Sequence, residues 1–232
     1  MRSARIAATA AAAQIVPAAT WLPVVRRLFP SLYGLGARDH VALTFDDGPN
    51  PASTPAFLEM LGAYGVRATF FVVGESVREA PELVRRMAAE GHEIGIHGWQ
   101  HRYTFTHSPR LARCIDLVGE VAGVRPLWFR PPYGVLSATG LIEARVNGLT
   151  PVLWSRWAKD WEVAITPESI HRRLSPRIAG GATLLLHDAG SPQAPQAWRA
   201  TLEALPRIFR DCKDAGLRVG TLAEHRIGGL SG

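Results

Sequence analysis

The sequence predicts an α/β protein whose parallel strands form a barrel with helices on the outside. From His40 onward, short apolar runs of β-forming residues alternate with amphipathic helical stretches. Such alternation is typical of parallel strands joined by right-handed helical crossovers. Polar residues also follow five of the predicted strands, and the chemistry of these barrels lies at the carboxyl ends of their strands. About seven strand–helix units would close the barrel on itself.

The individual elements follow from the spacing of apolar residues and from the Gly, Pro and polar residues that interrupt it. For example, Phe57, Leu58 and Leu61 share one face of a helix that Ser53 or Thr54 can cap. Strands are expected at residues 41–45, 68–73, 92–96, 127–129, 151–154, 183–186 and 217–222. Helices are expected at residues 53–64, 75–90, 111–121, 141–147, 167–174 and 196–215.

The composition suits a soluble protein with a sizeable core. Of the 232 residues, 47% are hydrophobic and 20% are charged. The net charge of +6 comes almost entirely from arginine. No basic stripe is interleaved with aromatic residues, so we expect no nucleic-acid partner. We also expect the protein to be a monomer. Cys114 and Cys212 lack metal-site spacing, and two buried free thiols are favoured over a disulfide.

We divide the chain into an N-terminal apolar extension (1–39), a catalytic domain (40–226) and a C-terminal tail (227–232). Within the extension, Ile6 to Val25 carry no formal charge and are flanked by arginines on both sides. A run of about 20 apolar residues can span a bilayer, and basic residues before such a run also characterise a signal peptide. Its alanines and two prolines weaken the drive to insert. We therefore expect an exported or membrane-tethered protein facing the cell envelope, with an uncleaved segment packed on a cytoplasmic protein as the alternative.

Two adjacent carboxylates, Asp46 and Asp47, follow the first predicted strand. Gly48 and Pro49 then force a turn, because glycine tolerates unusual backbone angles and proline fixes φ. Two like charges side by side are unfavourable unless a positive group lies near them. A divalent metal ion or an arginine would satisfy both carboxylates, and the alternative interpretation is a solvated surface turn.

Polar side chains after four later strands are expected at the same rim of the barrel. Two histidines spaced four residues apart can converge on one point, and one aspartate added to them makes the open site of a catalytic metal rather than a closed structural one. The alternative is a pair of ordinary loop histidines. The residues at these four strand ends are His97 and His101, Arg130, Asp160 with Trp161, and His187 with Asp188.

The other polar groups suggest complementary chemistry. The carboxylate that binds no metal can take a proton from a metal-bound water, and His187 is suited to give a proton to a leaving group. Arg130 would pair with that carboxylate and keep it ionised. Asp188 is expected to cap the following turn. Trp99 and Trp161 adjoin these groups and could form a wall that stacks a sugar or lines an acyl pocket.

Five motifs follow one another along the chain: Thr44–Pro49 (TFDDGP), His97 with His101, Arg130–Gly134 (RPPYG), Asp160 with Trp161, and Leu184–Asp188 (LLLHD). In this order they resemble the motifs of the polysaccharide deacetylases, the NodB-homology enzymes of carbohydrate esterase family 4. The resemblance extends from about His40 to Leu222. It implies a NodB-like deacetylase barrel, a distorted (β/α)7-type barrel. It also implies removal of N- or O-acetyl groups from sugars with one divalent metal ion, commonly zinc or cobalt.

Carried over motif by motif, the resemblance gives each residue a role. Asp46 would be the general base, oriented by Arg130. His187 would be the general acid, tuned by Asp160. The metal ligands would be Asp47, His97 and His101. The oxyanion would be bound by the backbone amide of Tyr133, and the acetyl pocket would be lined by Trp161 and Leu185.

Two positions depart from the family pattern. Gly98 stands where the family often has Ser or Thr after its first metal histidine, so the loop is expected to be softer. Trp157 stands three residues before Asp160, where the family often has Asp, and an aromatic side chain there would change the substrate preference.

The sequence therefore predicts a metal-dependent hydrolase that removes acetyl groups, foremost N-acetyl groups, from a carbohydrate such as peptidoglycan or a chitin-type oligosaccharide. Zn²⁺ is the expected ion, with Co²⁺ or another divalent ion as alternatives, and association with membrane or cell wall is expected. One alternative function is a hydrolase of the same superfamily acting on a non-sugar or lipid-linked C–N bond. Another is a catalytically silent carbohydrate-binding module, against which the intact set of acid, base and ligands argues.

Overall fold

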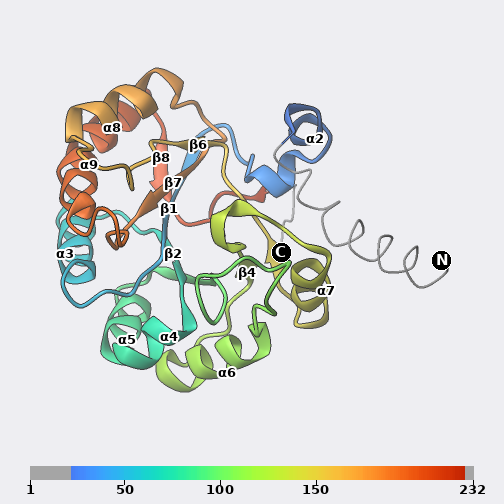
Figure 1. The fold of residues 1–232 in the computed structure, drawn as a ribbon. Coiled ribbons are helices and arrows are strands. Elements are labelled where there is room, and N and C mark those ends of the chain that lie inside the picture. The colour runs from blue at the N-terminus through green and yellow to red at the C-terminus, as the bar shows by residue number, and fades with distance from the viewer. Residues whose placement is uncertain (1–21, 228–232) are drawn as a thin grey trace.

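The computed structural model describes residues 22–227, and Figure 1 shows their arrangement. Most of the apolar run Ile6–Val25, on which the predicted leader or anchor rests, lies outside the described residues, as does most of the predicted tail. Within residues 22–227, no helix combines the length and the hydropathy needed to cross a bilayer. The division into extension, catalytic domain and tail stays a prediction.

A curled sheet of eight parallel strands lies at the centre of the fold (Figure 1). Neighbouring strands pair in the order β5-β4-β3-β2-β1-β7-β6, and β8 pairs with the first residues of β1. Within residues 22–227, β5 and β6 do not pair with each other, so the barrel is open between them. The predicted distorted barrel is confirmed. Its strands are β1 (His40–Asp46), β2 (Thr69–Val72), β3 (Glu93–Ile96), β4 (Trp128–Phe129), β5 (Thr150–Pro151), β6 (Arg156–Trp157), β7 (Thr183–His187) and β8 (Arg218–Gly220).

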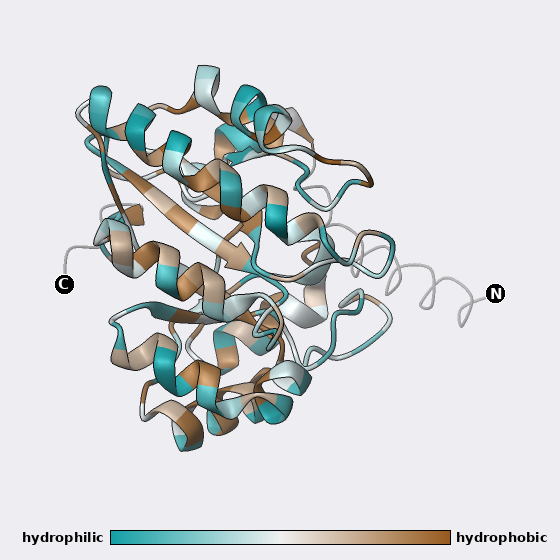
Figure 2. Ribbon diagram, turned by 90° about the vertical axis from the view of Figure 1, so that its left-hand side faces the viewer, coloured by the Kyte–Doolittle hydropathy of each residue, from teal (hydrophilic) through white to brown (hydrophobic). Residues whose placement is uncertain are grey.

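Helices surround the sheet, and hydrophilic and hydrophobic residues alternate along them (Figures 1 and 2). Cys114 in α6 and Cys212 in α9 are buried free thiols, as favoured from the sequence. The α-helices are α2 (Pro23–Leu28), α3 (Thr54–Tyr64), α4 (Gly74–Glu79), α5 (Pro81–Ala89), α6 (Leu111–Ala122), α7 (Ala138–Val146), α8 (Pro167–Leu174) and α9 (Ala197–Asp214). Short 3₁₀-helices are η2 (Pro30–Tyr33), η3 (Pro132–Gly134) and η4 (Ser175–Arg177).

The two faces of each strand have different surroundings. On β1, Phe45 packs against Phe57 of α3, with ring centroids 5.1 Å apart, in the core between sheet and helices. Ala42 belongs to a second cluster, with Phe71 of β2, on the other face of the sheet. Because side chains alternate along a strand, Asp46 lies on the same face of β1 as Ala42. The strand therefore ends with a carboxylate on the inner side of the barrel.

The single helix predicted over residues 75–90 is wrong. The chain forms two helices there, since α4 ends at Glu79 and α5 begins at Pro81. Ala80 between them has φ −136° and ψ 60°, outside the helical region. Proline has no N–H to donate and disfavours helical angles at the residue before it, so the break falls at this position.

The strand predicted over residues 151–154 is also wrong. β5 has only two residues, and pairing resumes at Arg156. Between them the carbonyls of Val152 and Leu153 accept hydrogen bonds from the Arg130 guanidinium, at 3.3 Å and 2.8 Å. These carbonyls are therefore bonded to a side chain rather than to a neighbouring strand, and the barrel stays open at this point.

The segment before β1 packs against the amino ends of the strands. The Thr183 hydroxyl at the start of β7 donates to the Gly34 carbonyl at 2.6 Å. The Ala37 amide donates to the His225 carbonyl at 2.8 Å. The first contact joins this segment to β7, and the second joins it to the last residues that the structure describes. Both lie on the side of the barrel opposite the rim where the polar groups lie.

Candidate active site

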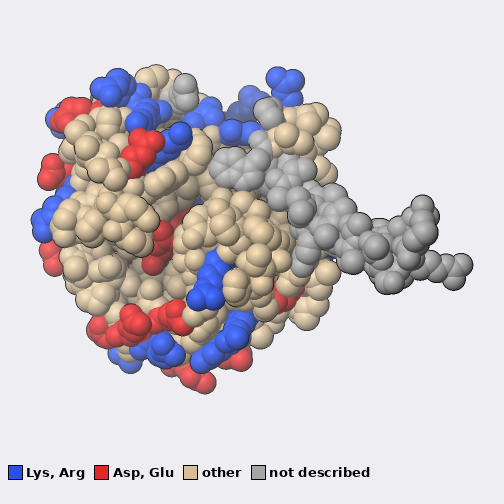
Figure 3. Space-filling model, in the orientation of Figure 1, with Lys and Arg blue, Asp and Glu red and all other residues tan. Residues whose placement is uncertain are grey.

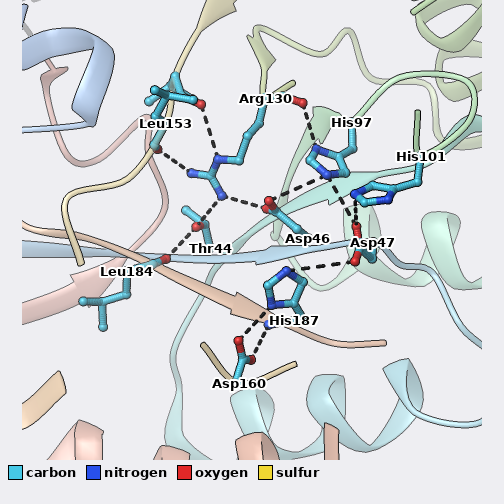
Figure 4. A network of polar contacts seen from close by, with 11 residues as sticks. Thr44, Asp46, Asp47, His97, His101, Arg130, Leu153, Asp160, Leu184 and His187 are labelled. Carbon is cyan, nitrogen blue, oxygen red and sulfur yellow. Dashed lines mark hydrogen bonds and ion pairs between the residues drawn. The ribbon is translucent and has the colours of Figure 1, made fainter. Parts of the chain in front are cut away.

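The polar groups expected at the strand ends lie together at one rim of the barrel (Figure 4). The register between β1 and β7 places Asp46 opposite His187. Asp47 follows beyond the strand and has a φ of 78°. In the space-filling view, acidic side chains lie in a hollow near the middle of the molecule, bordered largely by uncharged surface (Figure 3).

Three side chains at this rim have the arrangement of metal ligands. Asp47 Oδ1 lies 3.4 Å from His97 Nε2 and 3.3 Å from His101 Nε2, and the candidate ligand atoms all lie within 4.8 Å of one another. Asp47 Oδ1 is buried without a hydrogen-bond partner among the described residues. His97 Nδ1 donates to the Arg130 carbonyl at 2.8 Å, which leaves Nε2 free to bind an ion. Two nitrogens and one oxygen fit a divalent metal with an open coordination position.

The charges of the cluster keep Asp47 ionised. Burial raises the pKa of Asp47, but its contact with His97 and the nearby His187 and His101 outweigh burial, so that the pKa falls well below its usual range. Burial lowers the pKa of His101, an effect that Asp47 partly opposes. An anionic carboxylate and a neutral imidazole are the protonation states that bind a metal ion.

Asp46 is held by the guanidinium of Arg130, which is fully buried. Arg130 Nη1 donates to Asp46 Oδ1 and to Thr44 Oγ1, both at 2.7 Å. The guanidinium also lies over the Phe71 ring, 4.0 Å from its centroid. A charge-assisted hydrogen bond of this kind is stronger than one between neutral groups. Asp46 Oδ2 remains on the side of the metal-ligand cluster, 3.9 Å from His97 Nε2.

His187 lies on the other side of the cluster. Its Nδ1 is 2.9 Å from Asp160 Oδ1, and its backbone amide donates to Asp160 Oδ2 at 2.8 Å. Thr201 Oγ1 donates to the same Oδ2 at 2.9 Å, and His187 Nε2 lies 4.0 Å from Asp47 Oδ2. Burial lowers the pKa of His187, but Asp160 and then Asp47 outweigh burial and raise it to about 10. His187 therefore carries a proton at neutral pH.

The three residues expected to contact the substrate border the same site. The Trp161 ring meets the His187 ring edge-on, with centroids 5.2 Å apart at 78°. Leu185 is buried two residues before His187 on β7, so both point to the same side of the strand. Tyr133 has a φ of 60°, and its ring lies 4.3 Å from that of His101. The individual roles of these residues, which for Tyr133 is that of its backbone amide, stay predictions.

The structure shows the surroundings of Gly98 and Trp157, the two departures from the family pattern. Gly98 has a φ of 90°, a region that glycine adopts readily, and its carbonyl accepts from the Gly74 amide at 2.9 Å. The Trp99 carbonyl accepts from the next amide of α4 at 3.0 Å, so the loop expected to be soft is tied to the start of α4. Trp157 packs 5.3 Å from the Trp161 ring, beside the site.

The predicted aromatic wall is partly wrong. Trp99 is buried, and the Arg113 guanidinium lies 3.6 Å from its ring centroid, so Trp99 cannot stack a sugar.

Three exposed aromatic rings lie beside another part of the site. Tyr133 stacks on Tyr103 at 4.2 Å, and Tyr103 lies 5.1 Å from Phe105. We call these three residues the aromatic row. The sequence did not reveal it, because Tyr133 lies far along the chain from Tyr103 and Phe105, and the three form no periodic pattern.

Asp188 was expected to cap the turn that follows it, but it contacts the start of α3. Its side chain is fully buried. Asp188 Oδ2 accepts from Thr54 Oγ1 at 2.5 Å, and the Asp188 carbonyl accepts from Ser53 Oγ at 2.6 Å. Burial raises the pKa of Asp188 to about 7. The sequence suggested Ser53 and Thr54 only as helix caps, because no local pattern signals a contact across the sheet.

Replacing Asp160 with Asn should lower the pKa of His187, because it removes a carboxylate that favours the imidazolium and keeps the side-chain shape. A charged neighbour of this kind shifts a pKa by about 1–3 units. NMR of the histidine ring protons against pH, on chelator-treated protein, would measure the change, with His187→Gln identifying the resonance. Asp211→Asn removes the carboxylate 2.9 Å from His171 Nε2 and is the matched control. A His187 titration that is the same in Asp160→Asn and in wild type would contradict the pairing.

Comparison with known sequences agrees with this geometry. The sequence profile of the polysaccharide deacetylase family matches residues 35–152. A peptidoglycan-N-acetylglucosamine deacetylase of Bacillus cereus is 36% identical over 190 residues, which are 79% of this chain and 86% of that protein. A chitooligosaccharide deacetylase of Sinorhizobium fredii is 34% identical, over 83% of this chain and 94% of that protein.

Solved structures show the same likeness. A peptidoglycan N-acetylglucosamine deacetylase in complex with a naphthalenyl benzamide has a TM-score of 0.78 and 29% identity, covering 88% of this chain and 97% of that one. A family 4 carbohydrate esterase from Streptomyces lividans in complex with acetate has a TM-score of 0.70 and 31% identity, covering 79% and 93%. A family pseudoenzyme from Bacillus anthracis has a TM-score of 0.72 and 25% identity, covering 81% and 65%. The chain thus belongs to the polysaccharide deacetylase family, carbohydrate esterase family 4.

Proposed function

We propose that this protein is a metal-dependent deacetylase that hydrolyses the N-acetyl group of an amino sugar in a peptidoglycan or chitin-type glycan. The observation that carries the proposal is the placement of two opposed proton-transfer groups around one cluster of ligands. Asp46, bound by Arg130, lies on one side, 3.9 Å from His97 Nε2. The protonated His187 lies on the other side, 4.0 Å from Asp47 Oδ2. The names of the curated relatives support the choice of an acetylated glycan.

We assign Asp47, His97 and His101 as the ligands of one divalent ion, with Zn²⁺ as the proposed metal. The unpartnered Asp47 Oδ1 and the free His97 Nε2 support this set. When bound, such an ion acts as a Lewis acid that polarises a carbonyl and makes a water molecule more acidic. A site of two nitrogens and one oxygen also accepts other divalent ions, so Co²⁺ is the natural alternative.

The chain's own residues would divide the two proton transfers. Asp46, held by Arg130, would accept a proton from the attacking water. His187, held through Nδ1 by Asp160, would present a protonated Nε2 to the departing sugar nitrogen. The edge of the Trp161 ring next to His187 would exclude water from the acetyl group. The products would be acetate and a free amine on the sugar.

The pseudoenzyme among the structural neighbours makes a silent module the second candidate. A shared fold therefore does not by itself establish activity. In this chain the candidate base, acid and three ligands are all present and mutually oriented. This intact set favours an active enzyme over a silent binding module.

The aromatic row suggests that the substrate is longer than one sugar. Tyr133, Tyr103 and Phe105 have exposed fractions of 45%, 41% and 42%, and the row begins at the ring of His101. Phe105 is the last ring of the row and is exposed beyond its contact with Tyr103. Exposed aromatic rings bind the apolar faces of sugars. We infer that a sugar next to the acetylated residue packs against this row.

Acetate release would test the function. Chelator-stripped protein should be inactive on peptidoglycan and chitin oligomers, and Zn²⁺ or Co²⁺ should restore release. Asp46→Asn and His187→Gln should each lower kcat by about 10²-fold or more, because each removes a proton-transfer group. His171→Gln, which alters a histidine paired with Asp211 away from the site, is the control and should keep activity. No release from any glycan by protein with stoichiometric metal would contradict the proposal and favour a non-sugar C–N substrate.

Chain-length dependence would test the aromatic row. Phe105→Ala should lower kcat/KM for N-acetylglucosamine tetramers about 5- to 10-fold, the effect expected from losing an aromatic contact of about 1–1.4 kcal/mol, mainly through KM. The effect on the monomer should be much smaller. Tyr64→Ala, at an exposed aromatic position packed on Phe209, is the matched control. An equal loss on all chain lengths would mean that the row only supports its own loop.

A further inference from the structure

The carboxylate of Asp188 connects β7 to the loop that carries the candidate metal ligand Asp47. Asp188 follows His187 at the end of β7, and its side chain is fully buried. It bonds to neither of the two proton-transfer groups. Its Oδ2 accepts a hydrogen bond from Thr54 Oγ1, the first residue of α3, and its carbonyl accepts from Ser53 Oγ.

The contact with Thr54 continues into the loop. Thr54 Oγ1 accepts from the Asn50 amide at 2.8 Å while it donates to Asp188 Oδ2 at 2.5 Å. Asp188 also packs against Gly48, where a Cβ would lie 2.4 Å from Oδ2 and 2.5 Å from Oδ1. The carboxylate therefore holds the loop from Asp47 to α3 at both of its ends.

The loop needs such a restraint because of the backbone angle at Asp47. Its φ of 78° lies in the left-handed region, which side chains other than glycine rarely adopt without support from their surroundings. The β1–β7 register pairs Asp46 with His187, so Asp47 and Asp188 are the next residues along the two strands. The backbone at Asp47 is thus supported by Asp188, the residue that follows the candidate acid His187.

The burial of Asp188 also calls for an explanation beyond packing. A buried carboxylate is costly unless its oxygens are hydrogen-bonded, yet Asp188 Oδ1 has no hydrogen-bond partner among the described residues. An apolar side chain would fill the same space at a lower cost in solvation. The position instead carries the group that can bind Thr54 and lie against Gly48.

We propose that Asp188 is a positioning residue that acts through Thr54 and Gly48 to fix the Asp47 carboxylate relative to His187. The inference rests on the proposed metal binding by Asp47. Asp188 itself touches neither the metal nor the substrate. Its loss would leave the ligands in place but less well ordered, so metal affinity should fall.

Zn²⁺ affinity would test this role, measured on chelator-stripped protein by competition with a chromophoric chelator. Thr54→Val removes the hydroxyl and should weaken Zn²⁺ binding about 10-fold, the scale of an outer-shell contact. Thr54→Ser restores the hydroxyl and should return the affinity to near that of wild type. Asp188→Asn should weaken binding about 10- to 100-fold.

The matched control is Thr183→Val. Thr183 is also fully buried, and its hydroxyl donates to a backbone carbonyl at the other end of β7. This variant should lower the melting temperature of the metal-free protein as much as Thr54→Val does, with no change in Zn²⁺ affinity. If Asp188→Asn does not fold, the Zn²⁺ affinities of Thr54→Val and Thr54→Ser test the positioning role by themselves.

The outcomes separate this inference from the proposed function. If wild type binds Zn²⁺ and Thr54→Val binds it equally well, or no more weakly than Thr183→Val, the positioning role is wrong and the deacetylase proposal stands. If wild type binds Zn²⁺ and the variants differ as expected but no acetate is released, the deacetylase proposal is wrong and the role stands. If wild type does not bind Zn²⁺, the metal site and the inference are both wrong.

Discussion

The buried guanidinium of Arg130 is the interaction on which the site depends. Its Nη1 binds Asp46, while Nε and Nη2 bind the carbonyls of Val152 and Leu153 where the barrel stays open. Its own carbonyl accepts from His97 Nδ1 and so fixes which nitrogen of that ring is free for a metal. A buried charge is tolerated only when it is paired and its donors are bonded. One residue therefore binds the carbonyls at the opening of the sheet, pairs with a carboxylate and orients a candidate ligand.

The two neighbouring carboxylates at the end of β1 have different surroundings and different proposed roles. Asp46 lies within the strand, on the inner side of the barrel, and is neutralised by Arg130. Asp47 lies beyond the strand, where a left-handed backbone turns it toward His97 and His101. Adjacent like charges would otherwise repel each other, and these separate cationic or polar environments remove the conflict. In our proposal Asp188, at the end of the neighbouring strand β7, holds Asp47 in this position.

The fold could be predicted because its signals are local. Strand and helix periodicities, with Gly and Pro between them, placed most strands and helices from His40 onward within a few residues, although neither α2 nor β6 was expected. The family motifs gave the distorted barrel. The errors have identifiable causes. The break at Pro81 required weighing one proline against a continuous apolar pattern. The strand expected at 151–154 fails because a distant guanidinium, from Arg130, takes the carbonyls of Val152 and Leu153.

The sequence by itself determined which chemistry is available: the spacing of His97 and His101, the carboxylate pair and the motif order specify ligand types and a family. Only the tertiary structure decided how these groups act on one another. The pKa of His187 depends on Asp160, which comes from another segment, and the loop of Asp47 is held from β7. The aromatic row exists because η3 and the loop before α6 bring Tyr133 and Tyr103 into contact. The family resemblance named Asp160 as the partner of His187, but only the structure gives the distance between them and the resulting pKa shift. The other contacts join residues far apart in the chain, and a local sequence pattern does not describe them.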